Sequence, residues 1–295
     1  MDKPTDSNKE IRALVSLLDE PNEENYNSIS SKVLAYGMKA IPFLEEASEI
    51  SEEKEHIESI QLLINEIYFK DTYKSLSDWS DDDDSNLINA FLTISRMLNP
   101  EVDIEKYLSE FSIIRKDVWL ELNDNLTALE KIRVLNHIIY EYHMFSGQRS
   151  PNGNKLKLYS PDHLFDNKKG NSLSLGILYL AVAQNLNIPV YGVDLPGHFV
   201  LSYLDEKLDL SSSKVHSQEE VLFYLNAMNK GAVFTKNEIE SFVLQMNIMP
   251  EPSHFAPCSN KTIIKRLLKE VSLEVKLSGD ENKSKMLLNL VAAVK

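Results

Sequence analysis

The chain has a single cysteine, Cys258, among its 295 residues. One cysteine cannot form an intramolecular disulfide, so a disulfide-stabilised secreted domain is excluded and a reducing compartment is expected. Long apolar runs are also missing: the longest, around residues 173–183, is about half of the ~20 residues that a helix needs to cross a bilayer. The segment Met1–Asp6 lacks the basic and apolar parts of a secretory signal. We therefore expect a cytoplasmic protein without a membrane partner.

Basic charge is scarce. The net charge is −14, and residues 1–100 contribute −12 of it, from 21 acidic and 9 basic side chains. Most of the surface would repel a polyanion, so nucleic acid is not an expected partner. Residues 259–295 carry a net charge of +4, but they mix both signs, and we interpret them as a solvated helical face.

Metal-binding patterns are incomplete. The acidic run Ser80–Ser85 has neither the turn glycine nor the terminal glutamate of a calcium loop. His254 and Cys258 form half of a zinc pattern without a second half. The sequence thus predicts no metal and no cofactor. We interpret the acidic run as an exposed loop before a helix that begins near Asn86, and as a boundary within the helical region.

Apolar residues recur at helical spacing in four segments of the first ~70 residues. These segments are marked by Ile11, Leu14, Val15 and Leu18; by Tyr26, Ile29, Val33 and Leu34; by Ile41 and Leu44; and by Ile57, Ile60, Leu63, Ile64 and Ile67. Gly37 is expected to end the second helix, and Pro42 fits the first turn of the third. The helix pairs resemble one or two degenerate HEAT-type repeats, and a helical domain without true repeats remains equally open.

A further helix begins at Thr127, whose spacing to Glu130 predicts a capping box. Apolar residues continue this helix to Tyr142, and we interpret His137 within it as a structural residue. Residues 146–154 have the composition of a surface loop.

The most informative stretch is 168–200. Gly170-Asn171 forms a turn before an apolar helix over Leu173–Leu186, which Asn187-Ile188-Pro189 ends. A short strand and a second strand that begins with Gly197-His198 follow. This order resembles the papain-like transglutaminase core, in which a nucleophilic cysteine lies at the helix N-terminus and a histidine lies on the following strand.

Several segments together resemble the bacterial SirB-type transglutaminase-like family: residues 119–137, 169–189, 192–199, 223–234 and 250–260. The resemblance implies an α+β fold that is predominantly helical. It implies a HEAT-like helical N-terminal region (1–125), a papain/transglutaminase-like core with a small antiparallel sheet (126–258) and a C-terminal helical hairpin (259–295). The hairpin helices would be Thr262–Lys276 and Glu281–Val294, similar to a tetratricopeptide unit.

The same resemblance places Ser172 at the nucleophile position, His198 at the histidine position and Asn226 at the third position. A helix dipole stabilises a negative charge by ~0.3–1 kcal/mol, or up to ~2, far less than the difference between a hydroxyl and a thiol. Ser172 would need His198 as a general base within ~3 Å and an oxyanion hole. Alternatively, Ser172 or Asn171 is simply the N-cap of the helix.

A serine at the position of the nucleophilic cysteine leaves two functions open. The first is a non-catalytic, pseudoenzyme-like scaffold or regulator that binds protein or peptide partners through its helical N-terminal region and its hairpin. The second is a papain-fold hydrolase or acyl transferase that acts on an amide or peptide bond through Ser172, His198 and Asn226. We expect no role for Cys258 as a substitute nucleophile.

Overall fold

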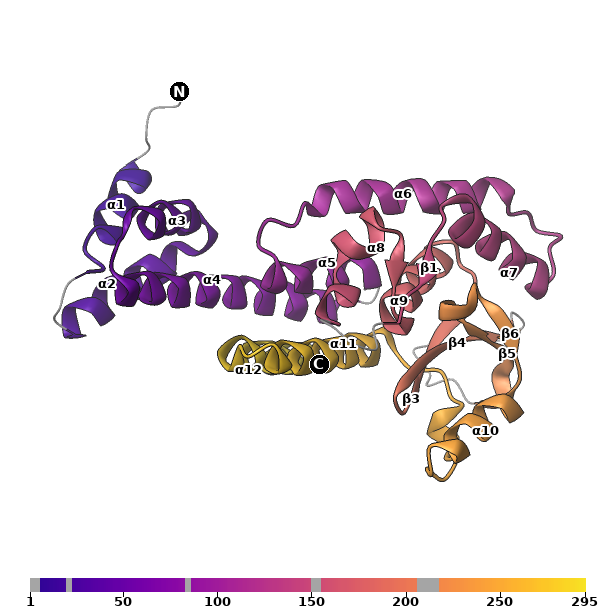
Figure 1. Cartoon of the computed structure of the whole chain (residues 1–295). Helices are drawn as coiled ribbons and strands as arrows, with labels where there is room; N and C mark the ends of the chain where they lie inside the picture. Colours follow the sequence, from indigo (N-terminus) through magenta and orange to yellow (C-terminus); the bar gives the residue numbers. More distant parts are fainter. Residues whose placement is uncertain (1–5, 20–22, 83–85, 150–154, 206–217) are drawn as a thin grey trace. The chain divides into compact units, whose positions relative to one another are not determined.

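The computed structural model describes residues 6–19, 23–82, 86–149, 155–205 and 218–295 (Figure 1). The chain divides into two compact units, residues 1–77 and residues 78–295.

The described part of the first unit consists of helices joined by short turns, without a strand. Its helices are α1 (Asp6–Val15), α2 (Glu23–Tyr36), α3 (Ile41–Ile50) and the greater part of α4 (Lys54–Asp81). Their apolar stripes meet in a core that includes Ile11, Val33, Leu44 and Ile60, each fully buried. Two sequence predictions are confirmed here: α2 ends before Gly37, which has a positive φ of 57°, and Pro42 lies in the first turn of α3.

The interpretation of Ser80–Ser85 as an exposed loop is wrong at its start. Ser80 and Asp81 are the last two residues of α4, because no helix-breaking residue separates them from the apolar stripe before them. Ser80 is buried, and its hydroxyl accepts a hydrogen bond from the backbone N–H of Lys295 at 2.9 Å. Residues 83–85 lie outside the described part. The next helix begins as expected, with Asn86 as its N-cap.

The second unit combines further helices with a small sheet. The helices are α5 (Leu87–Leu98), α6 (Ile104–Glu121), α7 (Ala128–Asn136), α8 (Pro161–Asp166), α9 (Ser172–Asn185), α10 (Lys236–Gln245), α11 (Asn260–Leu277) and α12 (Glu281–Asn289). The capping box of Thr127 and Glu130 is confirmed at the start of α7, and a π-helical segment, His137–Tyr142, continues that helix. His137 contacts Glu141 at 2.8 Å.

The main sheet has four antiparallel strands in chain order, β3 (Val190–Leu195), β4 (His198–Leu204), β5 (Val221–Asn226) and β6 (Ala232–Phe234). A separate parallel pair joins β1 (Ser146–Gly147) to β2 (Lys169–Gly170). Thus the predicted loop over 146–154 begins with a short strand, and its residues 150–154 lie outside the described part.

Helices cover both faces of the main sheet (Figure 1). Helix α9 packs on one face, where Gly176 lies so close to Phe199 that a Cβ atom would be 2.7 Å from its ring. Helix α10 packs on the other face, in a cluster of Val193, Leu195, Val200, Tyr224, Ile239, Val243 and Phe255. The alternation of side chains along β4 therefore assigns Phe199 to the α9 face and Val200 to the α10 face.

The C-terminal hairpin is formed by α11 and α12, which turn at Gly279-Asp280. A 3-10 helix, Leu290–Ala293, replaces the end of the predicted second helix. The predicted fold class, predominantly helical with small sheets, is confirmed, whereas the domain boundaries near residues 125 and 258 stay a prediction. In the described part of the chain, no helix is both long and apolar enough to cross a membrane.

Candidate functional site

The N-terminus of α9 is closed by Asn171, not by Ser172. The Oδ1 atom of Asn171 accepts hydrogen bonds from the backbone N–H groups of Leu173 (3.0 Å) and Ser174 (2.9 Å). The hydroxyl of Ser174 accepts the Asn171 N–H at 3.0 Å, which completes a capping box. Asn171 is thus the N-cap, and Ser172 is the first residue of the helix.

Ser172 is half-buried at this position. Its hydroxyl has no hydrogen-bond partner within the described ranges, in contrast to the buried hydroxyl of Ser174, which donates to the carbonyl of Leu158 at 2.8 Å. Its backbone N–H lies in the first turn of α9, where amides have no partner within the helix.

His198 is the first residue of β4, as the sequence predicts, and lies opposite Leu195 of β3. Directly paired residues of an antiparallel sheet share a face, and Leu195 belongs to the cluster under α10. The ring of His198 accordingly contacts the ring of Phe242 in α10, with the centroids 5.7 Å apart. The described residues include no hydrogen bond between Ser172 and His198.

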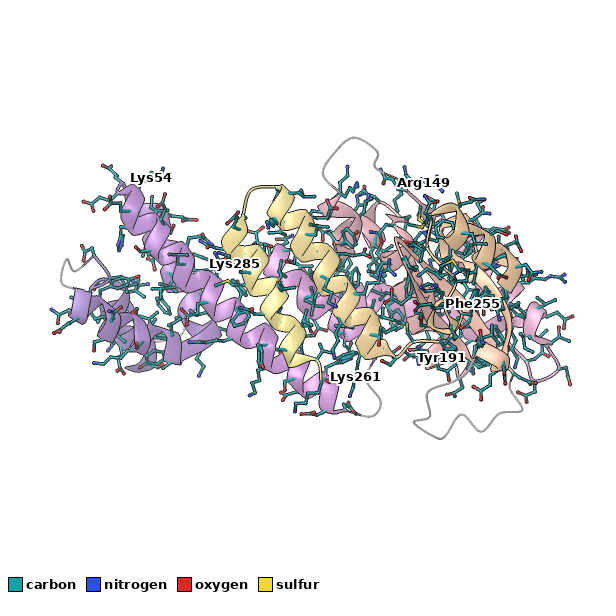
Figure 2. All side chains as sticks on the ribbon, turned by 90° about the horizontal axis from the view of Figure 1, so that it is seen from below. Lys54, Arg149, Tyr191, Phe255, Lys261 and Lys285 are labelled. Carbon is teal, nitrogen blue, oxygen red and sulfur yellow. The ribbon has the colours of Figure 1, made fainter. Side chains whose placement is uncertain are left out.

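The surroundings of His198 oppose its protonation. Burial lowers the pKa of His198 below its usual 6.5, and the positive charges of Arg266 and Arg149 lower it further, while Glu270 opposes them. Figure 2 labels Arg149, which follows β1. Because the pKa of His198 is low, its ring is neutral at neutral pH and does not supply an imidazolium that would stabilise a thiolate.

Arg266 of α11 fixes the turn between β3 and β4. Its Nη1 atom donates to the carbonyl oxygens of Leu195 and His198, each at 2.9 Å, and pairs with Asp194. Its Nε atom contacts Glu270 at 2.7 Å. No sequence motif pointed to Arg266, because only the fold brings α11 beside the turn.

Asn226, the last residue of β5, is engaged locally. Its Oδ1 atom accepts the backbone N–H of Met228 at 3.0 Å and caps the 3-10 helix Ala227–Asn229. The last pair of the β4–β5 ladder is Leu201–Leu225, so Asn226 lies one step further and diagonal to His198. Such diagonal neighbours are about 7–8 Å apart, a separation that aromatic and long side chains can still span. No hydrogen bond joins the two side chains in the part of the chain that is described.

Cys258 is also held by the fold and is not a reactive thiol. Its backbone N–H donates to the carbonyl of Gly192 at 2.7 Å. Burial, and then the charge of Asp194, raises the pKa of its thiol to about 12, so the thiolate is not formed at neutral pH. His254 is buried, and its Nδ1 atom accepts the N–H of Glu251. The described residues contain no group of three or more His, Cys, Asp or Glu side chains that could hold a metal.

A further polar network, partly buried, contacts α9 at Tyr179, in the middle of the helix. The hydroxyl of Tyr179 donates to Oδ1 of Asn136 at 2.9 Å, and Nδ2 of Asn136 donates to the carbonyl of Gly231 at 3.1 Å. This network joins α7, α9 and the turn after Asn226. The only sequence signal for it was a polar Asn136 within an apolar helical stripe.

The family model of the transglutaminase-like superfamily matches residues 105–269. This is more than half of the chain, which therefore belongs to the transglutaminase-like superfamily.

Three relatives illustrate how far the likeness extends. The chain is 25% identical to a UPF0162 protein of Vibrio cholerae serotype O1 over 191 residues, which cover 64% of this chain and 66% of that protein. It is 26% identical to a UPF0162 protein of Xylella fastidiosa over 121 residues, 41% of this chain and 43% of that protein. The human F-box only protein 21 is 29% identical over 115 residues, 38% of this chain and 17% of that protein. No solved structure matches the chain.

Proposed function

We propose that this chain is a SirB-type member of the superfamily that acts without catalysis, as a scaffold or regulator that binds a protein or peptide partner. One observation carries the proposal: the ring of His198 lies against Phe242, on the face of the sheet that α10 covers. A histidine that packs against Phe242 and forms no hydrogen bond with Ser172 supports a site without an activated nucleophile.

The other two positions support the same conclusion. Asn226 uses its side-chain oxygen to cap a turn, and the capping of α9 depends on Asn171 and Ser174 rather than on Ser172. The hydroxyl of Ser172 is an ordinary alcohol, which is a weak nucleophile unless a neighbouring base removes its proton. Cys258 offers no replacement, because its pKa of about 12 leaves almost no thiolate.

An enzyme that uses Ser172, His198 and Asn226 is the second candidate. It is favoured by the neutral state of His198, which is the form that a general base requires. Substrate binding would then have to bring the imidazole within hydrogen-bond reach of the Ser172 hydroxyl.

A turnover assay separates the two candidates. The proposal predicts no hydrolysis of p-nitrophenyl esters or peptide p-nitroanilides, and no acyl transfer to a fluorescent amine, above the rate of a His198→Ala variant. Turnover by the wild type that His198→Ala abolishes would establish the enzyme instead.

The remaining features of the proposal concern partners and location. The net charge of −14 favours protein over nucleic acid as the partner, and the single, half-buried thiol fits a reducing, cytoplasmic setting.

A further inference from the structure

The C-terminal hairpin has an open groove between its two helices. Figure 2 shows α11 and α12 side by side, with Lys261 labelled near the start of α11 and Lys285 on α12. The groove has a volume of about 300 Å³. Its lining residues are Lys269, Ser272, Leu273 and Lys276 of α11 and Glu281, Ser284, Lys285 and Leu288 of α12.

Each helix contributes a continuous face to the groove, because the lining residues recur at intervals of three and four. Ser272 and Ser284 are buried and form the floor. The hydroxyl of Ser272 donates to the carbonyl of Ser284 at 2.8 Å, and the hydroxyl of Ser284 donates to the carbonyl of Ser272 at 2.9 Å. These reciprocal hydrogen bonds join the two helices where small side chains let them approach. The longer side chains of the lining form the walls of the groove on either side.

The walls combine apolar and positive groups. Leu273 is 55% exposed and Leu288 is 51% exposed, so both present apolar surface to the groove. Lys269 and Lys276 flank Leu273 on α11, two turns or about 10 Å apart. Neither they nor Lys285 has an ion-pair partner among the residues that the structure describes. Three lysines face one glutamate, Glu281, in a chain that is otherwise strongly acidic.

We infer that this groove binds an acidic amphipathic helix of a partner protein, an inference that rests on the proposed scaffold function. Apolar side chains of such a helix would cover Leu273 and Leu288, and glutamates at its flanks would pair with Lys269, Lys276 and Lys285. A groove between two helices suits a third helix, whose apolar residues also recur at three and four. Nucleic acid phosphates would pair with the lysines but leave the leucines uncovered.

The test uses a designed probe with the whole chain. The probe is a fluorescein-labelled, alanine-based helical peptide of about 15 residues, with leucines on one face and glutamates on both flanks of that face. A control peptide carries lysines in place of the glutamates. Fluorescence anisotropy at low salt should show binding of the acidic peptide only. Replacing all three groove lysines (Lys269→Glu, Lys276→Glu, Lys285→Glu) should weaken this binding at least about tenfold, since each exposed pair is worth a few-fold in affinity.

A second variant separates a specific groove from general charge attraction. Lys39→Glu, Lys116→Glu and Lys155→Glu change the net charge by the same amount at exposed sites outside the groove. This variant should bind the acidic peptide within about twofold of the wild type at 150 mM salt, where charges further apart than ~8 Å are screened. Replacing Leu273 and Leu288 with serine should weaken binding about fivefold or more without unfolding the hairpin, because both side chains are half exposed.

Several results would overturn the inference. They are no binding of the acidic peptide at about 1 mM, equal binding of both peptides, or equal loss in the two lysine variants. Binding of phosphatidylglycerol vesicles that depends on the groove lysines would reassign the groove to membranes. Concentration-dependent self-association that the groove variant abolishes would reassign it to a second copy. None of these results affects the proposal that the chain is non-catalytic, because that proposal depends on Ser172 and His198. Conversely, turnover that depends on His198 would overturn the non-catalytic proposal and leave the peptide-binding result unchanged.

Discussion

Replacing Ser172 with cysteine, in a chain whose Cys258 has been changed to serine, places one thiol in the first turn of α9. In a papain-like site this thiol would form an ion pair with the histidine, and its pKa would be about 3–4. In this chain the ring of His198 contacts Phe242 and is neutral, so it contributes no positive charge to the thiolate.

The remaining influence on the new thiol is the helix itself. Amide groups at a helix N-terminus stabilise a negative charge by about 0.3–1 kcal/mol, and by up to about 2 in partly buried geometry. One pKa unit corresponds to about 1.4 kcal/mol, so the pKa should fall by roughly 0.2–1.5 units from the ~8.5 of a free cysteine. We therefore expect a pKa between about 7 and 8.3 for the cysteine at position 172.

The rate of alkylation by iodoacetamide, measured from pH 5 to pH 10, gives this pKa directly. Adding His198→Gln to the same background should shift it by no more than a few tenths of a unit. A pKa below about 6 that returns toward 8.5 with His198→Gln would refute the reasoning, because it would show a working thiolate–imidazolium pair.

Four further predictions concern the stability of the folded chain, each measured by urea denaturation. Asn171→Ala should lower the free energy of unfolding by about 1 kcal/mol, because two backbone N–H groups of α9 lose their acceptor. Gly231→Ala should cost about 3 kcal/mol or more, because its φ is 66° and the new Cβ would lie 1.9 Å from Oδ1 of Asn136. Gly279→Ala, with a positive φ but open space around it, should cost only about 1 kcal/mol. The pKa of His198 is lower in the folded chain than in the unfolded chain, so the unfolded chain binds the proton first as the pH falls. The free energy of unfolding should therefore decrease as the pH drops below about 7. His198→Gln should reduce this decrease between pH 7 and pH 5.

Local sequence signals predicted much of the fold. The capping box of Thr127 and Glu130, the apolar segment that became α9, and the turn at Gly279-Asp280 each depend on residues within one or two turns of one another. The extent of α4 was misjudged, because the acidic residues at its end resemble a loop, whereas the burial of Ser80 depends on a contact with Lys295 at the far end of the chain.

The candidate site was less accessible to sequence reasoning. The pattern placed His198 at the start of a strand correctly, but the face of a strand to which a residue points changes with every position. Only the pairing of His198 with Leu195, whose side chain packs under α10, settles that face. In the same way, the role of Asn226 as a cap of its own turn depends on local backbone geometry that a comparison of sequence motifs does not contain.

The central claim, that Ser172 is not an activated nucleophile, is tested most directly with a fluorophosphonate probe, which reacts covalently with serines that a general base activates. The wild-type chain would be incubated with an excess of the probe at pH 7.5, and the modified residues located by mass spectrometry of its peptides. The account predicts an unmodified Ser172 and the same low background in a His198→Ala variant. Near-stoichiometric modification of Ser172 in the wild type, lost in His198→Ala, would contradict it.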